Sequence, residues 1–191
     1  MAINPALSII ARQSPLIIER LRIAFPEKTF GIERVPTAMS IKEFNRIARH
    51  APFLGLAWQG MKTGNDARLL SGTMQWRLYL VCAASSGLEA RFKGDARGIG
   101  LDAMADVAAL VLNGVSFPDA GVISVTGANA IVADGFADDN IAIAQMDFTF
   151  SFVASTTELE LETAGDFKAL GVTWALAESD GITPQNEITG A

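Results

Sequence analysis

The stretch that most constrains the fold runs from Ile141 to Val153 and reads IAIAQMDFTFSFV. Its side chains alternate between apolar and polar, which is the period of a β-strand with one buried and one solvated face. The apolar positions are Ala144, Met146, Phe148, Phe150 and Phe152. Burial of each Phe or Met side chain contributes roughly 2 kcal/mol. We therefore expect a central strand of an antiparallel sheet, with helices covering its aromatic face.

Length and composition favour an α+β fold in one domain with an appendage. Half of the 191 residues are hydrophobic and 19% are charged, which is enough for a sizeable core. We expect residues 1–154 to form the domain and 155–191 a C-terminal arm that is partly strand, with a flexible end. No apolar run approaches the length of a membrane span, and no secretory signal pattern is visible, so we expect neither. A single cysteine, Cys82, excludes an intramolecular disulfide and fits a reducing cytosol.

Apolar spacing and capping residues predict a mostly antiparallel sheet covered by two to three helices, with a further short helix at 4–13. A start signal at Ser14 and Pro15 separates a short helix at 4–13 from a second one at 15–25. Ser40 is the expected cap of the next helix. The remaining helices are predicted at 40–49 and 100–113, the latter ended by Gly114.

Period-two alternation predicts the other strands, of which 72–82 is the clearest. Shorter strands are predicted at 30–35, 53–58, 122–125 and 130–133. The intervening segments 60–72 and 83–98 are polar and punctuated by glycine, so we expect loops there.

Charge is divided unevenly along the chain, which has a net charge of −6. Residues 1–100 hold 14 of the 15 Lys and Arg residues and seven of the 21 acids, a net charge of +7. Residues 101–191 hold one base and 14 acids, a net charge of −13. This asymmetry favours contacts between the basic surface of one copy and the acidic surface of another, and it disfavours general nucleic-acid binding. The alternative is that both sets of charges interleave on one folded surface.

The sequence indicates no catalytic residues, no cofactor and no metal site. His50, the single histidine, lies at a helix end, and Cys82 continues the apolar face of its strand, so neither forms a nucleophile–base arrangement. Three further groups have the wrong order or spacing for ligand binding and are better explained as turns and a solvated edge. They are Gly94, Gly98 and Gly100; Asp134, Asp138, Asp139 and Asn140; and Glu158, Glu160 and Glu162.

Residues near the two predicted loops, with one apolar face of the arm, are the candidate assembly interface. The basic members are Lys62, Arg68, Arg91, Lys93 and Arg97. The two loops flank opposite ends of the 72–82 strand, so they need not be adjacent. In the arm, Leu170, Val172 and Trp174 alternate along a short apolar face that needs a cover and could add a strand to a neighbour. The alternative for the basic residues is an ordinary solvated loop.

Several segments together resemble the Mu-like phage tail terminator family, which comprises small tail-completion proteins of contractile-tailed phages and prophages. They are IIERLRIAFP, EFNRIARHAPFLGLAWQG, WRLYLVCAAS, GIGLDAMADVAALVLNG, MDFTFSFVAS and DFKALGVTWALAESDG. The resemblance spans almost the whole chain, and its motifs are packing and turn patterns.

The resemblance implies a structural protein that forms a homomeric ring, usually a hexamer, at the head-proximal end of the tail tube. Such a ring halts polymerisation and prepares head joining. It implies as partners further copies of the chain, the tail tube and sheath proteins and a head–tail connector. The expected location is the virion, after assembly in the bacterial cytoplasm, with no membrane or sequence-specific nucleic-acid partner. Two alternatives stay open: a connector or neck protein of similar fold, and a small-molecule enzyme with a site beneath the 84–98 loop.

Overall fold

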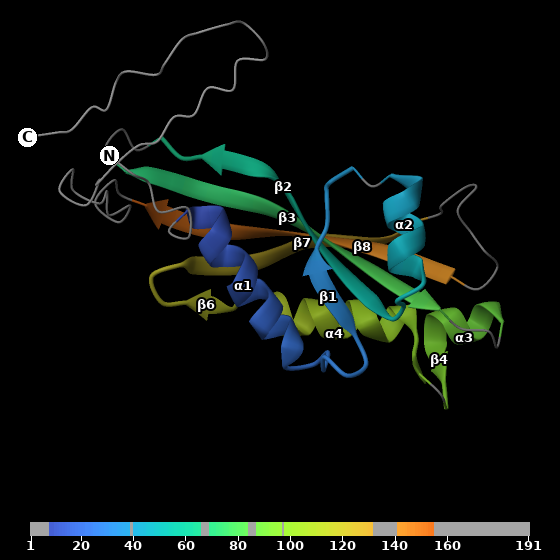
Figure 1. The fold of residues 1–191 in the computed structure, drawn as a ribbon. Helices are drawn as coiled ribbons and strands as arrows, with labels where there is room; N and C mark the ends of the chain where they lie inside the picture. The colour runs from blue at the N-terminus through green and yellow to red at the C-terminus, as the bar shows by residue number, and fades with distance from the viewer. Residues whose placement is uncertain are drawn as a thin grey trace, which may run out of the picture.

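A computed structural model describes residues 8–38, 40–65, 69–83, 87–96, 98–131 and 141–154. Within these ranges the protein is an α+β fold with four helices and a mostly antiparallel, curled sheet of six strands (Figure 1). A separate two-stranded ribbon, β4 and β5, follows the third helix. The elements are α1 Ile9–Arg22, β1 Gly31–Arg34, α2 Ile41–Ala48, β2 Phe53–Thr63, β3 Leu70–Ala83, α3 Leu88–Lys93, β4 Gly94–Asp95, β5 Gly98–Ile99, α4 Leu101–Leu112, β6 Ser116–Phe117, β7 Gly121–Ile131 and β8 Ile141–Ala154.

The two longest strands, β3 and β8, lie side by side at the centre of the sheet. The strand order is β1-β2-β3-β8-β7-β6, and only the β1–β2 pair is parallel. β3 and β8 pair over their full length, from Leu70 opposite Ala154 to Ala83 opposite Ile141. The prediction of a central antiparallel strand at 141–153 is therefore confirmed.

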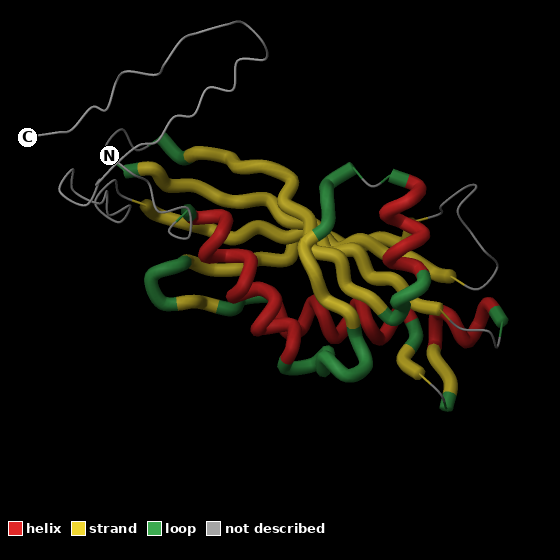
Figure 2. The backbone as a smooth tube through the Cα atoms, viewed as in Figure 1, coloured by secondary structure: helices red, strands yellow, loops and turns green. Residues whose placement is uncertain are grey.

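Helices cover the two faces of this sheet unequally. The aromatic face of β8 packs beneath α1 and α4, and Phe148, Phe150 and Phe152 are buried there as the alternation predicts. On the opposite face, Phe44 and Ile47 of α2 pack on one end of the sheet with a smaller buried cluster. Figure 2 shows α1 and α4 together along one side of the strands and α2 apart from them. Part of the second face therefore has no helix over it among the described residues.

The sheet bends along one line because two β-bulges lie on the same row of paired residues. β2 has an irregularity between Trp58 and Gly60, and β7 has one between Val125 and Gly127. Trp58 pairs with Trp76 of β3, which in turn pairs with Phe148 of β8, and Phe148 pairs with Val125. A bulge adds one residue, bends its strand and increases the local twist. Two bulges on one row therefore curl the whole sheet at this point.

The expected break between two N-terminal helices is wrong. One helix, α1, runs from Ile9 to Arg22 with Pro15 inside it, and its cap is Ser8, whose Oγ accepts from the backbone of Ala11 at 3.2 Å. An internal proline costs roughly 3 kcal/mol because it removes a backbone donor. Ile17 and Leu21 are fully buried on this helix, and such tertiary burial offsets the proline.

The two predicted loops contain regular structure. β2 continues to Thr63 and β3 begins at Leu70, so much of 60–72 forms the two arms of a hairpin. Most of 83–98 forms α3 and the β4–β5 ribbon. An ion pair at 2.7 Å between Glu89 and Lys93, one turn apart, supports α3, and Phe92 packs against the core. The polar composition of these segments predicted loops, because the apolar contacts that stabilise the regular elements involve residues far away in the sequence.

The predictions of short strands at 122–125 and 130–133 are replaced by one continuous strand, β7. Gly127 follows the bulge within this strand instead of ending it. The helices expected from Ser40 and from Gly100 are both present, and Ser40 Oγ accepts from Glu43 N at 3.2 Å. The predicted turn at 134–140, residues 132–133 of the last short strand, and the arm at 155–191 lie outside the described residues.

Candidate assembly surface

The part of the sheet without a helix over it is lined by polar side chains of β3, β7 and β8. Along β8, Gln145, Asp147, Thr149 and Ser151 point to this side, opposite the buried phenylalanines. We call this set, with Gln75 and Arg77 of β3, the polar sheet face. All six residues are half-buried.

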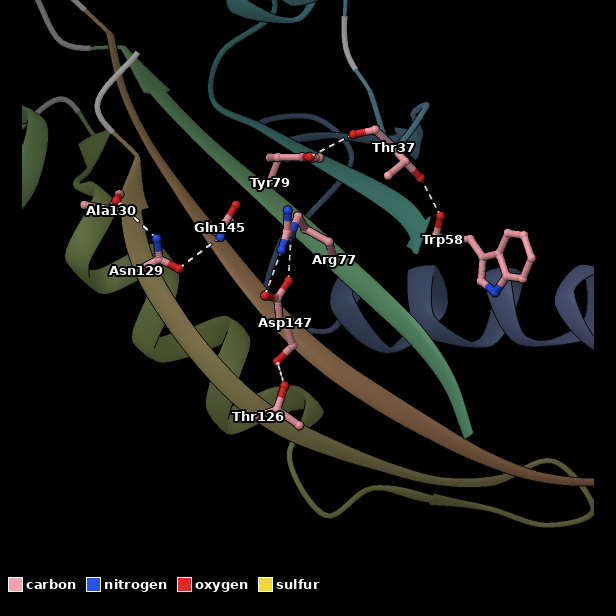
Figure 3. A network of polar contacts seen from close by, with 9 residues as sticks. All are labelled: Thr37, Trp58, Arg77, Tyr79, Thr126, Asn129, Ala130, Gln145 and Asp147. Carbon is pink, nitrogen blue, oxygen red and sulfur yellow. Dashed lines mark hydrogen bonds and ion pairs between the residues drawn. The ribbon is translucent and has the colours of Figure 1, made fainter. Parts of the chain in front are cut away.

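An ion pair at the centre of the polar sheet face joins β3 to β8. Arg77 Nε and one terminal nitrogen donate to the two carboxylate oxygens of Asp147, at 2.7 and 2.9 Å (Figure 3). The two residues are direct cross-strand partners. The bonds to Asp147, opposed by partial burial, raise the pKa of Arg77 above its ordinary value. The two charges neutralise each other, so the pair adds shape and polarity to the surface but little net field.

Hydroxyl and amide groups flank this ion pair and bridge β7 to β8. Gln145 Nε2 donates to Asn129 Oδ1 at 3.1 Å, and Thr126 Oγ1 donates to the Asp147 carbonyl at 2.9 Å (Figure 3). Ser151 Oγ accepts from the backbone of Val122 at 2.8 Å. Cross-strand polar pairs of this kind fix side-chain rotamers. The polar sheet face is therefore a pre-ordered surface with its own hydrogen bonds largely satisfied.

Tyr79 extends the network toward the β1 side of the sheet. Its hydroxyl donates to the carbonyl of Thr37 at 3.2 Å, and Thr37 Oγ1 donates to the carbonyl of Trp58 at 2.5 Å (Figure 3). These bonds tie the segment after β1 to the outer edge of β2. These hydrogen bonds hold the border of the polar sheet face that lies along β2.

The basic residues predicted as an interface lie at two ends of the sheet. Lys62 is exposed on β2 opposite Thr73, near the start of β3. Arg91 and Lys93 lie on α3, which follows the other end of β3. Lys93 is paired with Glu89, whereas Arg91 is half-buried with its Nε enclosed and without a hydrogen-bond partner. The structure therefore does not bring Lys62 together with the α3 pair. The other predicted interface residues lie outside the described residues: Arg68, Arg97, Leu170, Val172 and Trp174.

The residues considered for chemistry form no site among the described residues. His50 is exposed after α2, and Gly94, Gly98 and Gly100 belong to the β4–β5 ribbon and the start of α4. Cys82 is buried, and burial, with a smaller contribution from the Asp95 charge, raises the pKa of its thiol. No group of three or more potential metal ligands occurs in the parts of the chain that the structure describes.

Sequence reasoning recognised the polar side of 141–153 but did not single out Arg77. A usable signal was present: Arg77 is the one charged residue within Leu70–Ala83, and Asp147 is the one charged residue within Ile141–Ala154. Two amphipathic strands with one opposite charge each, on their polar sides, are natural cross-strand partners. The register needed to pair them comes only from the fold.

Comparison of the chain with protein-family models and with curated proteins gives no match in either case. In the described residues, each helix is too short or too polar to cross a lipid bilayer.

Proposed function

We propose that this protein is a structural subunit of a phage tail, which assembles into a ring at the head-proximal end of the tail tube and terminates tail polymerisation. The observation that carries the proposal is the polar sheet face. A pre-ordered, electrically balanced surface on a rigid sheet suits repeated contact with other subunits, because few side chains must be ordered on binding.

Three of the six segments that resemble tail terminators coincide with the two central strands, which carry this surface, and with the helix on the opposite face. WRLYLVCAAS covers most of β3, MDFTFSFVAS covers most of β8, and GIGLDAMADVAALVLNG covers α4. These three of the six segments therefore lie in the central sheet and the helix behind it. These elements form the rigid body that a ring subunit requires.

A tail-length assay tests this function. Phage tails assembled without a terminator grow overlong, and adding the purified protein should restore uniform tails that join heads. Tails of normal length that fail to join heads in its absence would instead identify a connector. Overlong tails that persist after addition of folded protein would contradict the proposal.

A charge placed on the polar sheet face tests the observation that carries the proposal. Thr149→Arg introduces an unpaired cation there and should abolish tail-length control, because the cation is desolvated without a partner. Ala11→Arg, at an exposed position on α1, is the matched control and should retain activity. Equal activity of both variants would remove this face from the interface.

The predicted basic surface at α3 has its own test. Reversing Arg91 and Lys93 to Glu should impair ring formation or tube capping if α3 meets an acidic partner. Unchanged tail length with the double variant would exclude this part of the molecule from the interface.

A further inference from the structure

β2 and β7, the second strands from the two edges of the sheet, are each covered by a short edge strand along only part of their length. On β2, residues Phe53 to Leu56 pair with β1. On β7, Gly121 and Val122 pair with β6. Past its bulge, each strand has no further strand beside it in the described part of the chain. The uncovered stretches, 60–63 on β2 and 127–131 on β7, lie at opposite edges and toward opposite ends of the sheet.

The outward-pointing backbone groups of β2 can be assigned from hydrogen bonds before the bulge. The carbonyls of Leu56 and Trp58 point outward, since they accept from Val35 N and Thr37 Oγ1. Backbone groups of alternate residues point to the same side of a strand, and the bulge inserts one extra residue. The outward residues past the bulge are therefore Met61 and Thr63.

The same reasoning assigns the outward groups of β7. Ile123 bonds outward to Val115, and Val125 N donates outward to Asn113 Oδ1 at 3.1 Å. Past the extra residue Thr126, Ala128 and Ala130 point outward. The carbonyl of Ala130 accepts a long bond of 3.4 Å from the neighbouring Asn129 side chain. The whole strand contains no charged residue and no proline, which are common protections of an exposed edge.

We propose that these two stretches pair with each other between copies of this chain, with β2 of one copy antiparallel to β7 of the next. The register that uses both stretches fully places Met61 opposite Ala130 and Thr63 opposite Ala128 as hydrogen-bonded pairs. Lys62 then lies opposite Asn129 on the polar side of the combined sheet, because Lys62 pairs with Thr73 and Asn129 with Gln145 within one copy.

We call this β2–β7 pairing between copies the joint. Strand direction and charge favour this head-to-tail joint over a symmetric pairing of two β7 strands. β2 and β7 run in opposite directions in the sheet, so neighbouring copies keep the same face toward the same side. Among described residues, the half of the chain that holds β2, within 1–100, has a net charge of +6, whereas the half that holds β7, within 101–154, has −4. The joint therefore brings opposite charges together, and two β7 strands would bring two acidic halves together.

This β2–β7 joint specifies one contact between neighbouring subunits of the proposed ring. That the assembly closes into a ring rests on the proposed function. Heterologous contacts form either a closed ring or an open filament. The joint itself uses only the backbone of two edge strands and makes no reference to a tail. Its failure and the failure of tail termination are therefore separately observable.

Disulfide trapping tests the joint in the full chain. Cys82 is buried, so cross-links arise from the introduced cysteines. A Lys62→Cys protein mixed with an Asn129→Cys protein should give a mixed disulfide dimer under mild oxidation, because directly opposed non-hydrogen-bonded residues have Cα atoms about 4.5 Å apart. The double variant should give a ladder or a closed covalent ring. Lys62→Cys mixed with Ala130→Cys, whose side chain lies on the other face, is the matched control and should not cross-link.

Each alternative outcome overturns the joint. Disulfide dimers of Asn129→Cys alone would show symmetric β7 pairing, and oligomers without the mixed disulfide would place the interface elsewhere. A chain that stays monomeric throughout and gives no mixed disulfide overturns it too. If tail length is normal but the mixed disulfide does not form, the joint is refuted and the proposed function stands. If the mixed disulfide forms but tails are overlong, the joint stands and the proposed function is refuted.

A proline variant gives a second, independent measurement. Ala130→Pro removes an outward backbone donor and leaves the bonds between β7 and β8 in place, since proline is tolerated on the open side of an edge strand. The variant should lose the oligomer, measured by solution mass, with little change in its thermal unfolding midpoint. An unchanged oligomer would contradict the joint.

Discussion

Arg77 and Asp147 show how a single pair of residues can define the polar side of a long sheet. The bidentate geometry orients both side chains, and each is still partly exposed, with 26% and 39% of the side-chain surface accessible. Solvent therefore weakens the attraction, and the contribution to stability is at most modest. The two bonds also fix the orientation of both side chains at the centre of the polar sheet face.

Replacement of both members of this pair should measure their coupling. Arg77→Met and Asp147→Asn should each lower the free energy of unfolding by about 1 kcal/mol, because each leaves the other residue's half-buried charge without its counter-charge. The double variant should lose less than the sum of the two, with a coupling of about 0.5 to 1 kcal/mol in urea denaturation. Additive losses would show that the pair orders the surface without stabilising the fold.

Because of Cys82, the stability of the folded protein should fall measurably at alkaline pH. Burial raises the pKa of this thiol in the folded state. Its unfolded pKa is about 8.5, so the unfolded chain loses the proton first as pH rises. The contribution of the Cys82 thiol to the free energy of unfolding is therefore fully present below the unfolded pKa. It is lost as the pH rises through the folded pKa.

Two measurements check the Cys82 prediction. Native protein at pH 8 should react with iodoacetamide much more slowly than protein unfolded in urea. Between pH 7 and 10, wild type should lose more stability than Cys82→Ala, which cannot titrate at this position. Parallel pH profiles for the two proteins would count against a shifted thiol.

At the scale of elements, β7 depends on a tight approach to β8 at its first residue. Gly121 has a φ of +121°, and a Cβ atom there would lie 1.8 Å from the carbonyl oxygen of Ser151. A side chain at this position meets backbone that cannot move without disturbing the β7–β8 pairing. Gly127, in the same strand, has open space around the equivalent position.

These two glycines make a matched pair of substitutions. Gly121→Ala should lower the free energy of unfolding by about 2 to 4 kcal/mol, because it combines a steric clash with an unfavourable backbone conformation. Gly127→Ala should change it by no more than about 0.5 kcal/mol. Urea denaturation of both variants measures the difference, and a mild effect of Gly121→Ala would mean that β7 shifts freely along β8.

At the scale of the whole molecule, the division of charge follows the division of the sheet. β1, β2 and β3 come from the basic first part of the chain, and β6, β7 and β8 come from the acidic second part. One edge of the sheet is therefore carried by the basic half and the other by the acidic half. Within the sheet, the two parts of the chain meet at the central β3–β8 pair, where Arg77 forms an ion pair with Asp147.

Deletion of residues 155–191 tests whether the C-terminal arm contributes to assembly. The truncated chain should remain folded, because it keeps the buried Phe148, Phe150 and Phe152 of β8. Assembly should weaken, since the apolar face that contains Leu170, Val172 and Trp174 is lost. Circular dichroism and solution mass measure the two effects. Normal assembly of a folded truncated protein would exclude the arm from the interface.

Sequence reasoning predicted the elements whose signal is local. Alternation located the central strand at 141–153, and capping chemistry at Ser40 located the start of α2. It failed where long-range packing outweighs a local signal, as at Pro15 inside α1, and where a glycine marks a bulge instead of an end, as at Gly127. The candidate surface was predicted in part, because the polar side of β8 follows from alternation, but the position of Arg77 opposite Asp147 does not.

The sequence by itself determined which side of each central strand is buried, because a period of two residues assigns every side chain to one of two faces. It also determined the division of charge between the two halves of the chain. Only the tertiary structure decided the strand order, the register of β3 against β8 and the half-covered edges of β2 and β7. These features depend on pairing between residues far apart in the chain, for which local periodicity gives no information.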